Sequence, residues 1–193
     1  KKVQFKKQVQ HFGASDKNTL IVALGAEPKS MDPSASNDVP SHCVYLHIYD
    51  TLLQRDQEGN LIPELAESWE QPDPLTLILH LRKGVKFHNV EEFTARDVVF
   101  TLNRDKVAPA VMTFFKDIDQ VEALDDYTVK ITTKKPFGPL LGYLAHKSGS
   151  IVSEKALKDA GDNYAHHPIG TAGDQVTELY SRQIQITLVE NQL

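Results

Sequence analysis

The fold is decided by the stretch Leu79-His-Leu-Arg-Lys-Gly-Val-Lys-Phe-His88 in the middle part of the 193-residue chain. Leucine occupies every second position from Leu75 to Leu81. A period of two is that of a β-strand with one apolar face. Lys83-Gly84 supplies turn residues directly afterwards. The stretch therefore predicts a strand that ends in a tight turn.

Two helices are predicted downstream by their capping residues. Thr94 is followed three residues later by Asp97 and then by an apolar run, which is typical of a capping box with Asp in the Glu position. Residues 153–160 form a second helical segment. Ser153 suits its N-cap, and Gly161 lies just past its end.

Upstream, residues 19–24 form a short apolar run that predicts a buried strand closed by Gly25. Residues 26–33 contain two prolines and predict a fixed loop. From Pro40 the period becomes helical. Apolar residues recur there at four-residue spacing until the turn at 56–60, namely Val44, Ile48 and Leu52.

Further strands are predicted at 127–131 and 183–189 by alternation of apolar and polar residues. Residues 1–15 hold neither a strand period nor a helix period and are expected to be a flexible leader or tag-like segment. Strands and helices are mixed without a regular βαβα rhythm. A mixed α/β chain arranged in two lobes is expected.

Composition argues for a folded protein that does not bind nucleic acid. Hydrophobic residues make up 40% and charged residues 24% of the chain, close to the globular average. The net charge of −5 is unsuited to neutralising phosphates. No apolar run reaches the roughly 18–20 residues that span a bilayer. The single cysteine, Cys43, cannot form a disulfide within the chain.

Motifs for several enzyme classes are absent from the sequence. It contains no Gly-x-x-x-x-Gly-Lys-Ser/Thr loop, no Gly-x-Ser-x-Gly elbow and no His-Glu-x-x-His helix. The acidic pairs Glu91-Glu92 and Asp125-Asp126 could serve acid–base chemistry, but solvated turns explain them more simply. Cys43 could be a nucleophile beside His42, and a small buried residue is the plainer interpretation.

The eight histidines raise the question of a metal site. His42 and His47 do not have the i,i+4 spacing that places two imidazoles on one helical face, nor does the pair His166-His167. No cysteine or carboxylate pattern completes a coordination shell. Hydrogen-bonded or solvent-facing histidines, without a metal or other cofactor, are therefore expected.

Three ordered blocks of sequence resemble the linked signature of the family-5 bacterial extracellular solute-binding proteins, namely 63–70, 79–88 and 92–98. Similar residues occur at the family's places in four flanking segments, 18–24, 31–33, 125–130 and 151–153. The resemblance covers residues 18–191. The blocks themselves look structural, because Trp69 offers a large apolar surface after a short acidic helix and Thr94 caps a helix.

The resemblance implies a fold of the periplasmic-binding-protein-like type II. In this family two large lobes close on the ligand, and a further domain is inserted in the first lobe. Residues 16–43 and 165–193 would form a partial first lobe, and residues 44–164 would form the inserted domain. The opposing lobe would be missing, so weak ligand binding is expected.

The resemblance also implies a function. The chain would be the extracytoplasmic substrate-binding component of a peptide ABC transporter, binding oligopeptides or dipeptides without covalent change and passing them to a membrane permease. A monomer in the periplasm or outside the cell is expected, anchored by a lipid that is not part of this chain. Alternatives are a family member for nickel, haem or sugar, a stand-alone interaction module, or a hydrolase that uses scattered His, Ser and Asp residues.

Candidate ligand-binding residues also follow from the resemblance. The loop after the first strand faces the cleft in the family, which implicates Glu27, Pro28, Lys29 and Ser30. Glu27 would suit a ligand ammonium group. The alternative is an ordinary surface loop whose path is fixed by its prolines.

Gly170 and Thr171 resemble the start of the family's Gly-Thr-Gly-Pro-aromatic strand at the cleft hinge, and they complete the candidate set. The chain continues differently, as Ala172-Gly173-Asp174. Two further departures occur where the family prefers glycine, at Glu64 and Val90. A β-branched residue such as valine tolerates a positive φ angle poorly.

Overall fold

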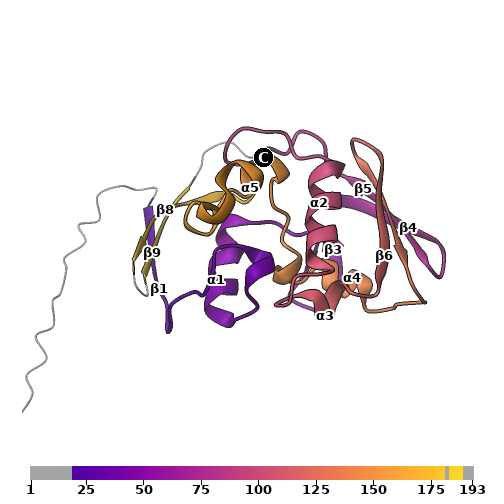
Figure 1. The fold of residues 1–193 in the computed structure, drawn as a ribbon, viewed down its shortest axis with the longest axis horizontal. Helices are drawn as coiled ribbons and strands as arrows, with labels where there is room; N and C mark the ends of the chain where they lie inside the picture. Colours follow the sequence, from indigo (N-terminus) through magenta and orange to yellow (C-terminus); the bar gives the residue numbers. More distant parts are fainter. Residues whose placement is uncertain (1–18, 181–182, 189–193) are drawn as a thin grey trace, which may run out of the picture.

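The structure, a computed structural model, describes residues 19–180 and 183–188. It is a mixed α and β protein with a sheet at each end of its long axis and helices between them (Figure 1). One sheet has the strand order β1-β9-β8, and the other has the order β4-β5-β7-β6. The expected mixed α/β class is therefore confirmed.

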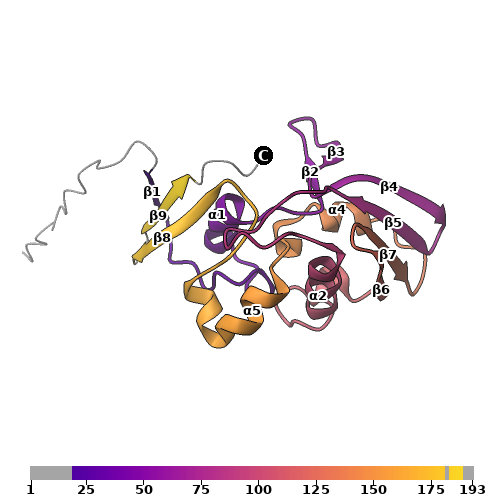
Figure 2. The same ribbon diagram turned by 90° about the horizontal axis from the view of Figure 1, so that it is seen from above.

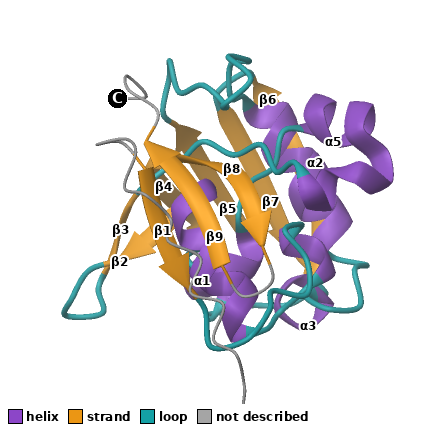
Figure 3. Cartoon of the chain, turned by 90° about the vertical axis from the view of Figure 1, so that its left-hand side faces the viewer, coloured by secondary structure: helices purple, strands orange, loops and turns teal. Residues whose placement is uncertain are grey.

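The three-stranded sheet joins segments that are far apart in the sequence. It contains β1 (Thr19–Ala23), β8 (Asp174–Tyr180) and β9 (Gln183–Leu188). The central strand β9 runs antiparallel to both neighbours. Figure 3 shows helix α1 (Val39–Ile48) lying behind this sheet. The strand expected at 19–24 is present as β1, and the strand expected at 183–189 is present as β9 up to Leu188, with Val189 outside the described residues. Strand β8 was not predicted.

The four-stranded antiparallel sheet carries the larger hydrophobic core. Its strands are β4 (Ala66–Asp73), β5 (Thr76–Leu81), β6 (Ile118–Asp125) and β7 (Thr128–Thr133). Helix α2 (Ala95–Asp105) covers one face of the sheet (Figure 2). The predicted apolar face of β5 is confirmed, because the leucines at 77, 79 and 81 are buried.

The remaining elements are short. They comprise β2 (Leu53–Arg55), β3 (Leu61–Pro63), α3 (Met112–Phe115), α4 (Leu140–Leu144) and α5 (Glu154–Ala160), with 3-10 turns η1 (Pro33–Ala35), η2 (Lys147–Gly149) and η3 (Gly161–His166). Strands β2 and β3 form a hairpin that projects from the body of the molecule (Figure 2).

Two local expectations were wrong. The helix that begins at Val39 ends at Ile48 rather than reaching the turn at 56–60, because Tyr49 is already extended, with φ −121° and ψ 143°. The segment expected as a short acidic helix before Trp69 is part of β4, where Trp69 lies opposite Leu79. Pairing with the apolar β5 strand outweighs local helix propensity there.

The predicted capping box is confirmed and has a second role. The Thr94 N–H donates to Oδ2 of Asp97 over 3.0 Å, and Oδ1 of Asp97 accepts the Glu154 N–H over 3.0 Å. One carboxylate therefore satisfies amides at the start of both α2 and α5. The Ser153 side chain caps α5 as expected, and Gly161 ends it with a φ of +53°.

The buried apolar residues form two clusters. The larger cluster is built from residues between 52 and 151. The smaller one joins Met31 to α1, α5 and Tyr164. The expected boundary between residues 43 and 44 lies inside α1. We therefore propose that α1 and α5 pack with the first lobe, and that the inserted domain extends from about residue 52 to about residue 151.

Candidate functional site

The loop after β1 is held from its inner side by side chains of α1. The Lys29 N–H donates to Oγ of Ser41 over 3.0 Å. The Tyr45 hydroxyl donates to the main-chain oxygen of Ser30 over 2.9 Å. These contacts fix the course of the loop without using the side chain of Lys29.

The loop presents two exposed charged side chains of opposite sign. Glu27 and Lys29 are both exposed, and Pro28 between them is half-buried. Within the described part of the chain, neither charged side chain takes part in an ion pair. Proline restricts the φ angle between them. The loop therefore offers an anion and a cation on a restrained backbone.

Gly170 lies against the end of α1. A Cβ atom at this position would lie 1.9 Å from the main-chain oxygen of Ile48 and 2.9 Å from Cδ1 of Tyr49. Its N–H donates to Nδ1 of His88 over 3.3 Å, and its oxygen accepts the His88 N–H over 2.9 Å. Only glycine fits this position, so Gly170 fixes the backbone at the C-terminal end of α1.

Thr171 is buried and faces a second polar group. Its side chain contacts the carboxylate of Asp50. Burial raises the pKa of Asp50, while the neighbouring Thr171 side chain and the charge of Lys147 oppose that rise. Thr171 is therefore enclosed next to Asp50 and is not open to solvent.

Tyr49 brings the two sets of candidate residues together. Its hydroxyl donates to the main-chain oxygen of Met31 over 2.8 Å, and the edge of the same ring packs against Gly170. The Tyr164 hydroxyl lies 3.4 Å from that of Tyr49 and donates to the oxygen of Ile169 over 2.9 Å. One aromatic cluster thus ties the loop segment at 30–31 to the segment at 169–170.

Sequence reasoning missed these tyrosines. Their only sequence signal is the i,i+4 spacing of Tyr45 and Tyr49, which places both on one face of a helix. It also missed an ion pair beneath the loop. Arg104 binds Asp32 with both ends of its guanidinium group, and one of these contacts measures 2.9 Å.

A buried carboxylate completes this polar layer. Oδ1 of Asp105 accepts the Ser34 hydroxyl over 2.5 Å, and Arg104 also donates to Ser34, over 2.9 Å. Burial raises the pKa of Asp105 to about 7, although the Ser34 hydrogen bond and the Arg104 charge lower it. The segment at 32–34 is therefore held by an ion pair with Arg104 and by hydrogen bonds to a carboxylate that titrates near neutral pH.

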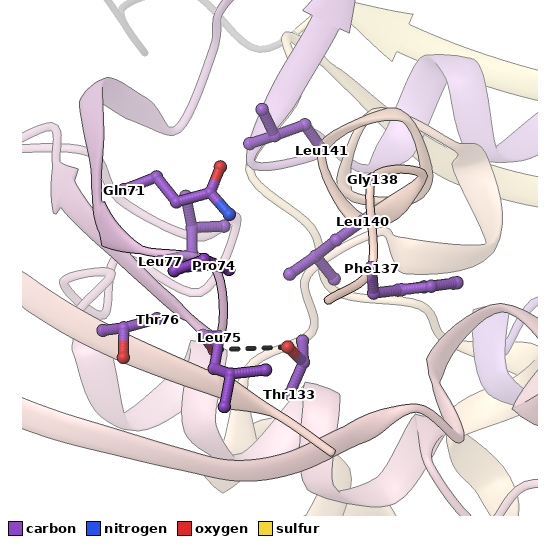
Figure 4. A pocket seen from close by; sticks show the side chains of 10 residues that line it. All are labelled: Gln71, Pro74, Leu75, Thr76, Leu77, Thr133, Phe137, Gly138, Leu140 and Leu141. Carbon is purple, nitrogen blue, oxygen red and sulfur yellow. Dashed lines mark hydrogen bonds between the residues drawn. The ribbon is translucent and has the colours of Figure 1, made fainter. Parts of the chain in front are cut away.

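Two hollows of different size occur in the described part of the chain. Figure 4 shows the first, whose volume is about 30 Å³ and which is lined by Leu75, Phe137 and Leu141 among others. It has room for about one water molecule. The second is an open groove along α2, and its two arginines are already paired, Arg96 with Glu154 and Arg104 with Asp32.

The residues weighed for catalysis or metal binding are placed as follows. Within the ranges 19–180 and 183–188, no three His, Cys, Asp or Glu side chains are grouped so that they could hold a metal. Asp125 accepts the Tyr127 N–H over 2.7 Å in a turn. Glu91 binds Nζ of Lys155 over 2.5 Å. Cys43 is half-buried.

The two departures from family glycines have different outcomes. Val90 adopts a φ of +64°, the left-handed region that suits glycine, so valine is strained there. Glu64 does not have a positive φ. Its carboxylate accepts the Thr51 N–H over 2.7 Å and so has a structural partner.

A restrained loop with exposed opposite charges is chemically suited to hold a small polar ligand without covalent change. The class of protein is shown by comparison with known proteins, which assigns the chain to the solute-binding proteins. A sequence profile of the bacterial extracellular solute-binding proteins, family 5 (middle), matches residues 60–192. The chain belongs to this family, which consists of binding proteins and not of enzymes.

Relatives and solved structures agree with this assignment. The glutathione-binding protein GsiB of Pectobacterium atrosepticum is 37% identical over 155 residues, which is 78% of this chain and 30% of that protein. The periplasmic binding protein DppA of Helicobacter pylori, in complex with the peptide STSA, has a TM-score of 0.78 at 31% identity. That match covers 87% of this chain and 38% of DppA.

A third match binds a different ligand. The binding protein MoaA of A. tumefaciens R10, in complex with mannopinic acid, has a TM-score of 0.77 at 29% identity, covering 84% of this chain and 35% of MoaA. The expected type II periplasmic-binding-protein fold is therefore confirmed. The chain spans about a third of the length of the proteins it matches. None of the helices in the described ranges is long and apolar enough to cross a bilayer.

Proposed function

We propose that the chain provides the loop-bearing part of a ligand site for short peptides, glutathione among them, in an ABC-transport binding protein. The observation that carries the proposal is the pair of exposed charges at Glu27 and Lys29 on a loop fixed by α1. Short peptides carry an ammonium group and at least one carboxylate. The loop offers a partner for each.

The individual roles follow from the chemistry of the loop. Glu27 would accept hydrogen bonds from the ligand ammonium, and Lys29 would attract a carboxylate. Pro28 holds the backbone between them. The oxygen of Ser30 is already used by Tyr45, so Ser30 would help to form the site mainly through its position.

Gly170 and Thr171 would belong to the same site as its rear wall. Gly170 permits the close approach to Ile48, and Thr171 contacts Asp50. Because Tyr49 contacts both Met31 and Gly170, a substitution at Gly170 would also alter the position of the loop. We propose that ligand contacts concentrate on residues 27–30.

The wider role is inferred from the family. The whole protein would act as a monomer outside the cytoplasm, in the periplasm or anchored to the membrane by a lipid, and would deliver ligand to a membrane permease. A stand-alone interaction module derived from such a protein remains the alternative role, and tight peptide binding by this chain would count against it. Weak binding, on the order of 1 mM, is expected where only one side of the ligand is covered.

Calorimetry with single charge variants tests the proposal. Glutathione and a mixed set of di- to pentapeptides are titrated into the chain and into E27Q and K29Q. Removing either charge is expected to weaken peptide binding about three- to tenfold, because a charge-assisted hydrogen bond is lost. E58Q serves as a matched control, since Glu58 is an exposed carboxylate on the β2–β3 turn. Equal loss in E58Q and E27Q would contradict the assignment of Glu27.

A second ligand class is supported by one observation. MoaA, which matches this fold closely, was solved with mannopinic acid, a ligand that is not a peptide. The same two charges could hold an acidic sugar derivative. Titration of mannopinic acid beside glutathione distinguishes the classes, and stronger binding of mannopinic acid would replace the peptide assignment. Nickel and haem are tested as further ligands in the same way.

A further inference from the structure

Two histidines from different segments are in direct contact beside the candidate loop. His42 lies on α1, and His146 precedes η2. Their ring centroids are 5.3 Å apart in an edge-to-face arrangement, and His146 also packs on Phe114 of α3 with a centroid distance of 4.7 Å. The pair therefore links α1 to η2 and α3.

Both imidazole rings contact the same serine, Ser148. Nδ1 of His146 accepts the Ser148 N–H over 3.2 Å, so Nδ1 carries no proton. The Ser148 hydroxyl donates to Oδ1 of Asn37 over 3.1 Å. Ser148 Oγ also lies 3.4 Å from Nε2 of His42, and the imidazole can donate in this contact. Protonating Nδ1 of His146 would remove the acceptor that caps η2.

A short relay connects the pair to the loop. Oδ1 of Asp38 accepts the Ser41 N–H over 3.0 Å, and Oδ2 accepts the Ser41 hydroxyl over 2.9 Å. Ser41 Oγ in turn accepts the Lys29 N–H. His42 lies one helical turn after Asp38, so a charged His42 would compete with Ser41 for this carboxylate.

Among the described residues, few charged groups act on the pair. Asp38 faces His42 from the helix cap, and Lys29 acts on Asp38 from the loop. Lys147, next to His146 in sequence, acts on Asp50 and Glu64. Burial lowers the pKa of both histidines. Asp38 opposes this at His42, and the charge of His42 lowers the pKa of His146 further.

We propose that the contact between His42 and His146 is a proton-sensitive brace of the candidate loop, such that protonation of both rings breaks the contact and loosens the loop at Lys29. Two imidazolium rings at this separation repel each other. Mild acid would therefore weaken ligand binding by the same site. This last consequence rests on the proposed function, whereas the effect on the loop does not.

The test follows the Lys29 amide and the histidine ring protons by NMR between pH 7.5 and 5. In the unchanged chain, the Lys29 amide shift should follow the titration of the histidine pair. In H42Q, the pKa of His146 should rise, because a neighbouring charge is removed. In the H42Q/H146N variant, the response of Lys29 should be lost, while asparagine can still accept at the η2 cap.

H80Q is the matched control, because His80 is a half-exposed histidine beside Glu70 on the β4–β5 pair. It should leave the Lys29 response unchanged. The proposal is overturned if the Lys29 amide shift does not change between pH 7.5 and 5. It is also overturned if the shift changes by the same amount in H42Q as in the unchanged chain. If the double variant does not fold at pH 7.5, the single variant H42Q decides the question.

Ligand affinity provides a separate readout. Binding of glutathione should weaken about fivefold from pH 7.5 to 5, and less in H42Q. If glutathione binds at neither pH, the proposed function fails while the Lys29 readout still decides the brace. If the affinity falls equally in H42Q and in the unchanged chain, the brace is not its cause and the proposal is overturned.

Discussion

Gly170 lies so close to Ile48 that a Cβ atom would stand 1.9 Å from the Ile48 carbonyl oxygen. The neighbour is backbone and cannot swing away as a flexible side chain would. We expect G170A to destabilise the fold by roughly 3 kcal/mol, the upper part of the range for overpacking. Urea unfolding measures the change. G138A is the matched control, because a Cβ at Gly138 would meet nothing within 4 Å.

Similar unfolding midpoints for G170A and G138A would mean that the end of α1 and the 169–171 segment are not packed as described. Glu27 and Lys29 would then lose their structural tie to the hinge segment. Since Gly170 touches no ligand group through a side chain, its effect on binding should appear only through the loss of stability.

The hydroxyl of Tyr49 should contribute more to the free energy of unfolding than the hydroxyl of an exposed tyrosine. Its hydroxyl is buried and donates to the Met31 oxygen. Y49F leaves that oxygen without its partner, so we expect a loss of about 1–2 kcal/mol and faster amide exchange at residues 29–32. Tyr127, whose hydroxyl meets Glu92 at the surface, is the control. Equal losses for Y49F and Y127F would argue against the role of Tyr49 as a tie.

At Val90, unlike at Gly170 and Tyr49, a substitution is expected to stabilise the fold. Its φ of +64° costs about 1–2 kcal/mol for a residue with a side chain, and glycine adopts it freely. The greater flexibility of glycine in the unfolded chain offsets part of that gain. We expect V90G to raise the free energy of unfolding by up to about 1 kcal/mol. Thermal unfolding is a suitable measurement.

Val107 is a close control for this substitution, because it is exposed to 72% compared with 78% for Val90 and does not have a positive φ. V107G should destabilise slightly, by about 0.5–1 kcal/mol. A loss of stability in V90G comparable to that in V107G would show that the strain at residue 90 is absent.

Asp105 should make stability fall as pH rises. Its folded pKa of about 7 lies above the ordinary value of an aspartate, so the stability it contributes is fully present below about pH 4 and is lost as pH rises through 7. The free energy of unfolding of D105N minus that of the unchanged chain should therefore increase by a few kcal/mol as the pH is raised from 4 to 8. Urea unfolding at several pH values measures the difference between the two chains. A difference independent of pH would contradict the burial of a titrating carboxylate there.

Local signals predicted the elements that depend on local structure. Leucines at 77, 79 and 81 indicated β5, and the Thr94–Asp97 pair indicated the start of α2. Strand β6 was missed because a register shift between Ile118 and Gln120 breaks its period of two. The shifts in β4 had the same effect, and that strand is fixed by its pairing with β5.

The candidate site was predictable only in part. Prolines and charges drew attention to residues 27–30, and the departure at Val90 correctly pointed to a positive φ. The tyrosine cluster was not foreseen, because its hydroxyls bind main-chain oxygens, and such acceptors leave no sequence pattern. The contact between His42 and His146 was not foreseen either, because the two residues lie far apart in the sequence and only the fold brings them together.

The central claim is that residues 27–30 form the ligand-contacting loop, with Gly170 and Thr171 behind it. The most direct measurement is a two-dimensional NMR titration of the chain with glutathione and with the peptide Ser-Thr-Ser-Ala. The account predicts that the amide shifts of residues 27–30 and 170–171 move together as ligand approaches the millimolar range. No movement at about 10 mM ligand, or movement confined to the surroundings of Leu75 and Phe137, would contradict it.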